Sequence, residues 1–145
     1  MSEENYAAPD LALVGEEHVR RYLETNGEVG HDWNGVPALL LTTKGRKSGE
    51  DRTSALIYGR LGNDYVIIAS MAGAPTNPAW YLNLVATPEV TLQAGADRFV
   101  ARARTAEGEE RDAGWAAMVK IWPNYDVYQS RTERVIPVVV LERVS

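Results

Sequence analysis

The chain contains no cysteine, which excludes disulfide bonds, thiolate nucleophiles and metal centres with cysteine ligands. It has two histidines, His18 and His31, and neither has a partner at metal-ligand spacing. We expect His18 to have a surface or helix-packing role and His31 to make a local hydrogen bond beside Asp32. HExxH and GxSxG motifs are also absent, so an enzyme built on this sequence is expected to rely on a bound cofactor for its difficult chemistry.

Basic residues are in the minority, with 15 Lys and Arg against 20 Asp and Glu, a net charge of -5 and a pI of about 5.1. This balance argues against general nucleic-acid binding. No apolar run is long enough to span a membrane, and Met1–Asn5 lacks the basic start and apolar block of a signal peptide. We therefore expect a cytoplasmic protein with, at most, peripheral membrane contact.

The length of 145 residues suits one domain, residues 1–145, with residues 1–28 as an N-terminal helical extension. Hairpins without regular strand–helix alternation argue against a Rossmann fold and favour a small antiparallel barrel with helices outside. We expect Asn77 and Thr105 to cap helices. The pattern predicts helices from Pro9 to Asn26, at 78–86 and from Thr105 to Pro123, and a turn-like or helical segment at 124–133. It predicts strands at 37–43, 52–60, 65–70, 89–94, 98–104 and 135–144. Pro137 suggests an edge or a bulge in the last of these strands.

One short loop is basic in this acidic chain. Lys44–Arg52 places four cations within nine residues, and two glycines frame its turn. Glycines allow successive backbone N–H groups to point outward and form an anion-binding concavity. Lysine and arginine add charge-assisted hydrogen bonds to phosphate or carboxylate groups. The alternative interpretation is a solvated hairpin turn, since charge runs are usually solvated.

Two further segments have features of a ligand site. Small residues at 69–74 would let a flat ligand approach the backbone. The helix that begins at Pro78 offers free N–H groups and a positive dipole end to an anionic or carbonyl-rich ligand. Taken singly, each has a plain alternative, because small residues form turns and residues such as Trp80 and Tyr81 usually belong to a core.

Together these segments resemble the deazaflavin-dependent nitroreductase family of actinobacteria and their relatives. The similarity spans about residues 29–142 and implies a mainly β fold, a split β-barrel of about six mostly antiparallel strands with three to four flanking helices. It also implies binding of coenzyme F420, a 5-deazaflavin with a phospholactyl and oligoglutamate tail. The residues that carry the similarity are 39–49, Arg52, 69–74, 77–84, 88–90, Tyr125, Tyr128, Gln129, Arg131, Thr132 and 134–142.

The resemblance implies that the basic loop holds the anionic tail and that neighbouring segments border the ring. Met71 stands where family members often have lysine, which removes one cation near the phosphate. The cofactor-binding residues implied are Arg46, Lys47, Ser48, Arg52, Thr53, Ser54, Ala55, Leu56, Ile57, Ile68, Ala69, Ser70, Met71, Ala79, Trp80, Tyr81, Leu82, Asn83 and Tyr125.

The same resemblance places Trp122, Tyr125 and Tyr128 on the substrate side, with Ser70, Tyr125 and Tyr128 as catalytic candidates and no metal. Trp122 stands where some members have tyrosine. The implied reaction is hydride transfer from the reduced deazaflavin to an electron-poor acceptor such as a conjugated enone, quinone or nitroaromatic, with catalysis from positioning and polarisation. The proton would come from Tyr125, Tyr128 or water. The plain alternative is that the three aromatic residues pack the last helix.

Two other classes of function remain open. One is a flavin- or haem-binding protein on the same barrel, and the other is a non-catalytic cofactor carrier or lipid-binding module. Four cations favour a tail longer than the single phosphate of FMN, so FMN is the less favoured cofactor. We expect a monomer or weak dimer, in which the N-terminal helix and the C-terminal aromatic segment cover the barrel within one chain.

Overall fold

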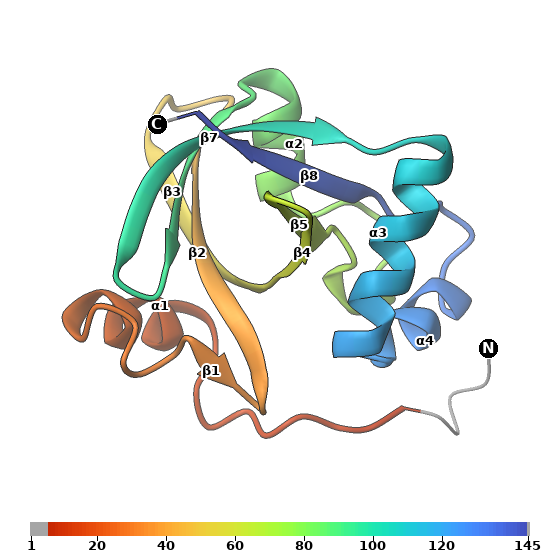
Figure 1. Ribbon diagram of the computed structural model, residues 1–145, viewed down its shortest axis with the longest axis horizontal. Coiled ribbons are helices and arrows are strands. Elements are labelled where there is room, and N and C mark those ends of the chain that lie inside the picture. Colours follow the sequence, from red (N-terminus) through yellow and green to blue (C-terminus); the bar gives the residue numbers. More distant parts are fainter. Residues whose placement is uncertain (1–5, 145) are drawn as a thin grey trace.

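Antiparallel strands dominate the computed structural model, which describes residues 6–144 (Figure 1). The segment Met1–Asn5, used above to argue against a signal peptide, lies outside the described residues. Within residues 6–144, no helix has both the length and the apolar character needed to cross a membrane. The elements are α1 (Gly15–Glu24), β1 (Asp32–Trp33), β2 (Val36–Lys44), β3 (Asp51–Ile57), β4 (Gly59–Leu61), β5 (Asp64–Ile68), η2 (Met71–Gly73), α2 (Ala79–Ala86), β6 (Glu89–Ala94), β7 (Asp97–Thr105), α3 (Gly108–Ile121), α4 (Asn124–Ser130) and β8 (Val138–Arg143).

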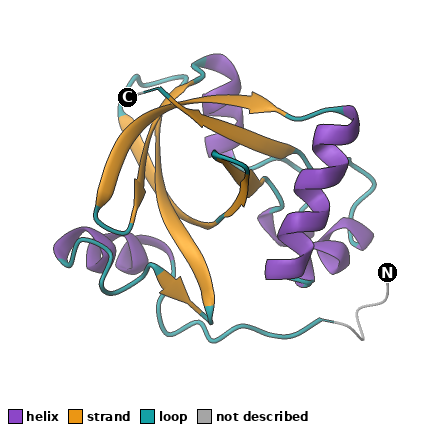
Figure 2. Ribbon diagram, viewed as in Figure 1, coloured by secondary structure: helices purple, strands orange, loops and turns teal. Residues whose placement is uncertain are grey.

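The sheet curls round on itself because one stretch of chain contributes to both of its ends (Figure 2). The strand order runs β2-β6-β7-β8-β5-β4, β3 pairs with the other side of β2, and β1 adds a short pairing at the start of β2. Strands β3 and β4 follow each other in sequence, separated by Tyr58. The prediction of one strand over 52–60 is therefore wrong, because the bend at Tyr58 transfers the chain from β2 to β5. The mainly β barrel itself is confirmed.

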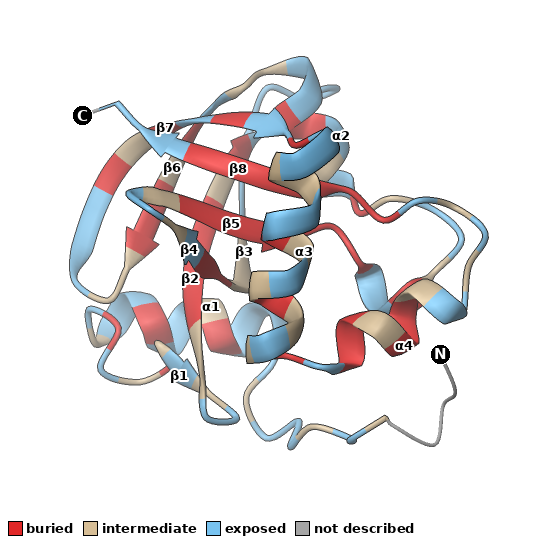
Figure 3. Cartoon of the chain, turned by 45° about the vertical axis from the view of Figure 1, so that its right-hand side comes forward, coloured by how far each residue is buried: buried red, intermediate tan, exposed pale blue. Residues whose placement is uncertain are grey.

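Strand β5 is apolar on both faces because it is covered on both sides. Tyr65 and Ile67 belong to the cluster inside the curled sheet, together with residues such as Leu39 and Leu92. Val66 and Ile68, which alternate with them, pack instead with Met118 and Trp122 at α3 and its end. Figure 3 shows the buried strands β5 and β8 passing behind α3. This double coverage explains the continuous apolar runs that the sequence shows in both strands.

Helix α1 begins later than predicted. Residues 9–14 are not helical, because their backbone is engaged by distant side chains. The Asn34 amide accepts from the Asp10 N–H at 2.8 Å and donates to the Asp10 carbonyl at 3.0 Å. Trp33 Nε1 donates to the Leu13 carbonyl at 2.6 Å. The start at Pro9 is thus wrong, and tertiary contacts set the beginning of the helix.

The predictions for the two histidines have different outcomes. His18 is buried in α1, with Nε2 2.8 Å from the Gly30 carbonyl, so its packing role is confirmed. The local bond expected for His31 beside Asp32 is wrong. Its Nε2 lies 2.8 Å from the Tyr58 hydroxyl, at the bend between β3 and β4.

Both predicted helix caps are wrong, because each side chain bonds to a distant element. The side-chain Oδ1 of Asn77 accepts from Arg134 at 2.8 Å, and Thr105 Oγ1 lies 2.8 Å from the Tyr81 hydroxyl. Neither α2 nor α3 has a side-chain cap at its first turn. Strand β8 begins at Val138, so Pro137 precedes the strand and is neither an edge nor a bulge within it.

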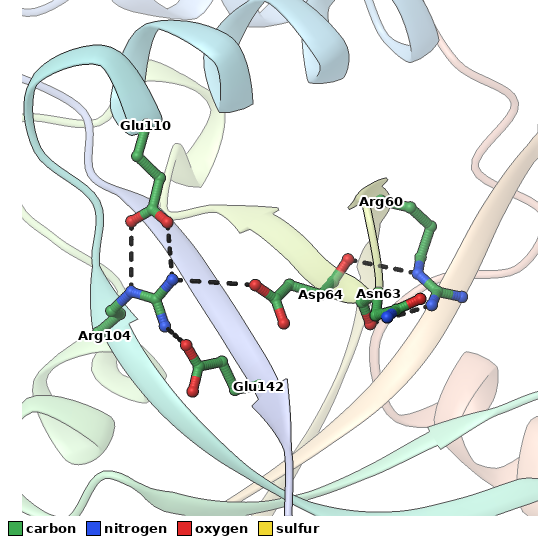
Figure 4. Close-up of polar contacts among 6 residues, drawn as sticks. All are labelled: Arg60, Asn63, Asp64, Arg104, Glu110 and Glu142. Atoms are coloured by element: carbon green, nitrogen blue, oxygen red, sulfur yellow. Dashed lines mark hydrogen bonds and ion pairs between the residues drawn. The ribbon is translucent and has the colours of Figure 1, made fainter.

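An exposed ion cluster joins α3 to the sheet (Figure 4). Arg104 on β7 lies 2.7 Å from Glu110 of α3 and 3.9 Å from Asp64 of β5, and it also pairs with Glu142 of β8. The hydrogen bond from Arg104 lowers the pKa of Glu110 below its ordinary value, and Coulombic attraction from Arg104 adds to this. The four side chains are between 34% and 48% exposed, so solvent weakens each pair.

We expect Arg104→Met to lower the free energy of unfolding by about 1 kcal/mol at neutral pH, because the carboxylates then face one another without a cation. The folded pKa of Glu110 is depressed, so this contribution is present above the unfolded carboxyl pKa of about 4.3 and is lost below it. Thermal unfolding from pH 7 down to about pH 3 should show the deficit shrinking. Arg102→Met, an exposed position on the same strand, is the control, and a deficit independent of pH would contradict the assignment.

Candidate functional site

An apolar cavity of about 300 Å³ lies where the curled sheet meets α1, α2 and α4. Segments distant in sequence meet there, because β3, the end of β5 and the aromatic residues of α4 all contribute walls. The predicted site residues that line the cavity are Ala55, Leu56, Ile57, Ile68, Ser70, Met71, Trp80, Trp122, Tyr125 and Tyr128. The cavity therefore joins part of the predicted cofactor site to the whole predicted substrate side.

A second hollow of about 680 Å³, the basic groove, lies between the basic loop, the start of β3 and α2. Trp80 lines both hollows, and β3 runs from the groove at Thr53 to the cavity at Ile57. The groove and the cavity thus adjoin along one strand. The predicted site residues that line the groove are Arg46, Lys47, Ser48, Arg52, Thr53, Ser54, Ala79, Trp80 and Asn83.

Three predicted cofactor residues line neither hollow. Ala69 is fully buried and Leu82 is exposed on α2. The Tyr81 hydroxyl lies 2.8 Å from Thr105 Oγ1, and its ring packs against the barrel core. Lys44, one of the four cations of the basic loop, is exposed and also lies outside the groove lining.

The basic groove is accessible and mixed in charge. Its cations are Arg46, Lys47 and Arg52, and two acidic residues, Glu16 and Asp51, lie at its edges. Arg52 also lies 3.5 Å from Glu50, a pair in which both side chains are more than half exposed. Exposed pairs of this kind are weak. Arg52 can therefore turn to a bound anion at small cost.

Asn83 fastens the basic loop to α2. Its side chain is buried, and its carbonyl oxygen accepts from the Arg46 backbone N–H at 3.2 Å and from Arg46 Nη1 at 3.0 Å. Its amide nitrogen donates to Thr43 Oγ1 at 3.2 Å. Although the resemblance implied a cofactor contact here, the amide already makes these internal bonds. Asn83 therefore holds the loop in place from beneath the groove.

We expect Asn83→Ala to weaken binding of an anionic ligand in the groove and to lower the free energy of unfolding by about 1–3 kcal/mol, because buried polar partners are left unpaired. Since the groove keeps its charge, the salt dependence of binding should stay as in the unaltered protein. Fluorescence titration at several salt concentrations measures the affinity and its salt dependence, and denaturant unfolding measures the free energy of unfolding. Leu82→Ala, on the exposed face of the same helix, is the control, and unaltered affinity in Asn83→Ala would remove the anchoring role.

Tyr125 and Tyr128 share one face of α4, as their spacing predicted. Both are buried and line the cavity, with ring centroids 6.0 Å apart. Trp122 Nε1 donates to the Tyr128 hydroxyl at 3.4 Å. Burial raises the pKa of Tyr125 well above its ordinary value, and the neighbouring Tyr128 adds to this. Tyr125 therefore keeps its proton, so its hydroxyl suits hydrogen-bond donation better than proton release.

Sequence reasoning missed several residues at the site. His18 and Trp33 line the cavity because α1 and β1 fold back over β3, a packing for which the sequence carries no local signal. Arg134 makes four hydrogen bonds to the loop that follows β5. The position of Arg134 just before a long apolar run is the one local signal in the sequence, and it entered the prediction only through the family resemblance.

The combination of a curled antiparallel sheet, a cationic groove and an adjoining aromatic cavity defines a cofactor-binding barrel protein. A family model described as F420H2-dependent quinone reductase matches residues 14–143. The chain belongs to this family.

Individual relatives agree with this assignment. An F420H2-dependent quinone reductase of Mycobacterium tuberculosis (strain H37Rv) is 43% identical over 130 residues, which cover 87% of each chain. A solved structure of an F420H2-dependent reductase is 40% identical with a TM-score of 0.69, over 73% of this chain and 94% of that one. Another solved structure, described as a domain-swapped dimer, is 38% identical with a TM-score of 0.72, over 87% of this chain and 95% of that one.

Proposed function

We propose that this protein is an oxidoreductase that takes hydride from reduced F420 and reduces a small electron-poor acceptor, with quinones as the favoured class and enones or nitroaromatics as further candidates. Family membership and the 43% identical quinone reductase support the cofactor and the reaction type. The single structural observation that carries the proposal is the basic groove adjoining an apolar cavity at Trp80. A ligand with an anionic tail and a flat ring matches that two-part shape.

The donor set fits this cofactor. Arg46, Lys47 and Arg52 would hold the anionic tail through charge-assisted bonds, and hydroxyl groups of the groove, such as that of Ser48, would add neutral ones. The apolar wall of β3 and Trp80 would hold the ring in the cavity. When bound, the reduced cofactor supplies a hydride. Met71, at the position where lysine is frequent in the family, adds no cation to this site.

The chain's own residues would then orient and polarise the acceptor. Ser70, Tyr125 and Tyr128 line the cavity, and their hydroxyl groups would donate hydrogen bonds to an acceptor oxygen. Trp122, which lines the same cavity, would exclude water and hold the acceptor flat. Tyr125, Tyr128 or water would supply the proton that completes the reduction.

Cofactor titration followed by turnover tests the proposal. Tight binding of F420, with weak binding of FMN and haem, would separate it from a flavin- or haem-binding barrel. Oxidation of reduced F420 on addition of a quinone would separate an enzyme from a carrier or lipid-binding module. A protein that prefers FMN, or that binds F420 and reduces no acceptor, would contradict the proposal.

The state of assembly and the location are also part of this proposal. We propose one domain, residues 1–145, that is cytoplasmic and acts as a monomer or weak dimer without nucleic-acid partners. One relative is described as a domain-swapped dimer, which makes the assembly of this chain worth measuring. Light scattering at micromolar concentration that shows a stable dimer would refute the monomer.

A further inference from the structure

The loop between β5 and α2 has an unusual backbone conformation where it borders the cavity. Ser70 is right-handed, with φ -80° and ψ -39°, whereas the next two residues are left-handed, Met71 with φ 46° and Ala72 with φ 53°. Residues other than glycine seldom adopt positive φ. A right-handed residue followed by a left-handed one turns successive backbone N–H groups to the same side, and such a concavity binds anions. All three residues line the cavity.

Arg134 fixes the direction of these peptide groups. Its Nη1 donates to the Ala69 carbonyl at 3.2 Å and its Nη2 to the Ser70 carbonyl at 2.8 Å. In a planar trans peptide the N–H points away from the carbonyl. The N–H groups of Ser70 and Met71 therefore point away from Arg134. No residue that the structure describes accepts a hydrogen bond from the N–H of Ser70, Met71 or Ala72.

Further contacts hold the loop in this strained form. Arg134 Nε donates to the Ala74 carbonyl at 2.8 Å, and Nη1 donates to Asn77 Oδ1 at 2.8 Å. On its other side the loop packs tightly against α4, since a Cβ on Gly73 would lie 2.6 Å from the Tyr128 carbonyl oxygen. The guanidinium keeps its charge in proteins. Its positive charge behind the loop also favours negative charge in front of it.

We propose that the backbone N–H groups of residues 70–72 form a binding site for an electron-rich carbonyl oxygen, and that Arg134 is the positioning residue that holds this site in shape. The identity of the ligand rests on the proposed function. Its oxygen has two possible sources, a ring carbonyl of the cofactor or the carbonyl of the acceptor. Both present the same chemistry to the loop.

The first test needs no cofactor. In Arg134→Met, backbone hydrogen–deuterium exchange at Gly73 and Ala74 should become at least tenfold faster, because these amides donate to Ser70 and Met71 within the loop. Arg102→Met, an exposed arginine on β7, should leave this exchange unchanged. Unaltered protection in Arg134→Met would overturn the positioning role. If Arg134→Met does not fold, Arg134→Lys should show a smaller acceleration of the same amides.

The second test asks whether Arg134 acts through the strained backbone. Glycine adopts positive φ readily, so Ala72→Gly should depend less on Arg134 to keep the loop conformation. We expect the double variant Arg134→Met with Ala72→Gly to turn over several-fold faster than Arg134→Met alone, and this gain to exceed any change that Ala72→Gly causes when Arg134 is present. Identical effects in both backgrounds would show that the two positions are not coupled and would overturn the proposal.

The third test separates the two sources of oxygen. If the site holds a cofactor carbonyl, Arg134→Met should raise the Kd for F420 by tenfold or more. If it holds the acceptor, the Kd should stay constant while kcat/KM for a quinone falls by the same factor. Either result supports the site, and unaltered values of both would overturn it. Should the unaltered protein neither bind F420 nor reduce a quinone, the proposed function fails, while the exchange measurement still decides the role of Arg134.

Discussion

Lys47→Ala and Arg52→Ala are each expected to weaken F420 binding by about 1–3 kcal/mol, since each removes a charge-assisted contact to the anionic tail. Both side chains line the basic groove. The loss should be larger for Lys47, because Arg52 already shares its charge with Glu50 at 3.5 Å. Fluorescence titration of the cofactor measures both affinities.

Lys44→Ala is the matched control for these variants. Lys44 belongs to the same basic loop and carries the same charge, but it does not line the groove. Its removal should change affinity little, and raising the salt concentration should narrow the difference between Lys47→Ala and the unaltered protein. If Lys47→Ala, Arg52→Ala and Lys44→Ala all bound F420 as tightly as the unaltered protein, the basic loop would not be part of the cofactor site.

Tyr125→Phe and Tyr128→Phe are expected to lower hydride transfer to a quinone by about tenfold or more, because each removes a hydrogen bond that strengthens as the acceptor oxygen gains charge. Both hydroxyls belong to residues that line the cavity beside Ser70. Cofactor affinity should be nearly intact, with at most a small loss in Tyr125→Phe. Steady-state turnover together with cofactor titration separates the two effects.

The pH dependence gives this prediction a second readout. Burial holds the pKa of Tyr125 above its ordinary value of 10, so its ionisation should not limit turnover below about pH 10. Tyr81→Phe is the control, because that hydroxyl bonds Thr105 outside the cavity. Full turnover in both cavity variants with several acceptors would leave the tyrosines as packing residues.

The barrel was predictable because its signals are local. Apolar runs and the basic loop identify most strands, and β6 (Glu89–Ala94) and β7 (Asp97–Thr105) lie at or within one residue of the predicted 89–94 and 98–104. The bend at Tyr58 was not predictable, because the run on either side of it is continuous in sequence. It depends on the Tyr58 N–H bonding the Pro37 carbonyl at 3.1 Å, and on β4 finding β5 as its partner.

The site was predictable where charge or aromatic content marked it. The resemblance brought together the basic loop, Ser70 and the tyrosines of α4, and the structure places these residues along two adjoining hollows. The role of Arg134 and the two wrongly predicted helix caps show where prediction from the sequence fails. Asn77 has the residue type and position of a helix cap, yet it accepts from Arg134 instead, because tertiary hydrogen bonds compete with local ones.

A crystal structure of the protein with F420 is the most direct test of the two-part cofactor site. We predict the anionic tail in the basic groove near Arg46, Lys47 and Arg52, and the deazaflavin ring in the cavity beside Trp80 and the 70–72 loop. A tail bound away from the groove, or a ring outside the cavity, would contradict it.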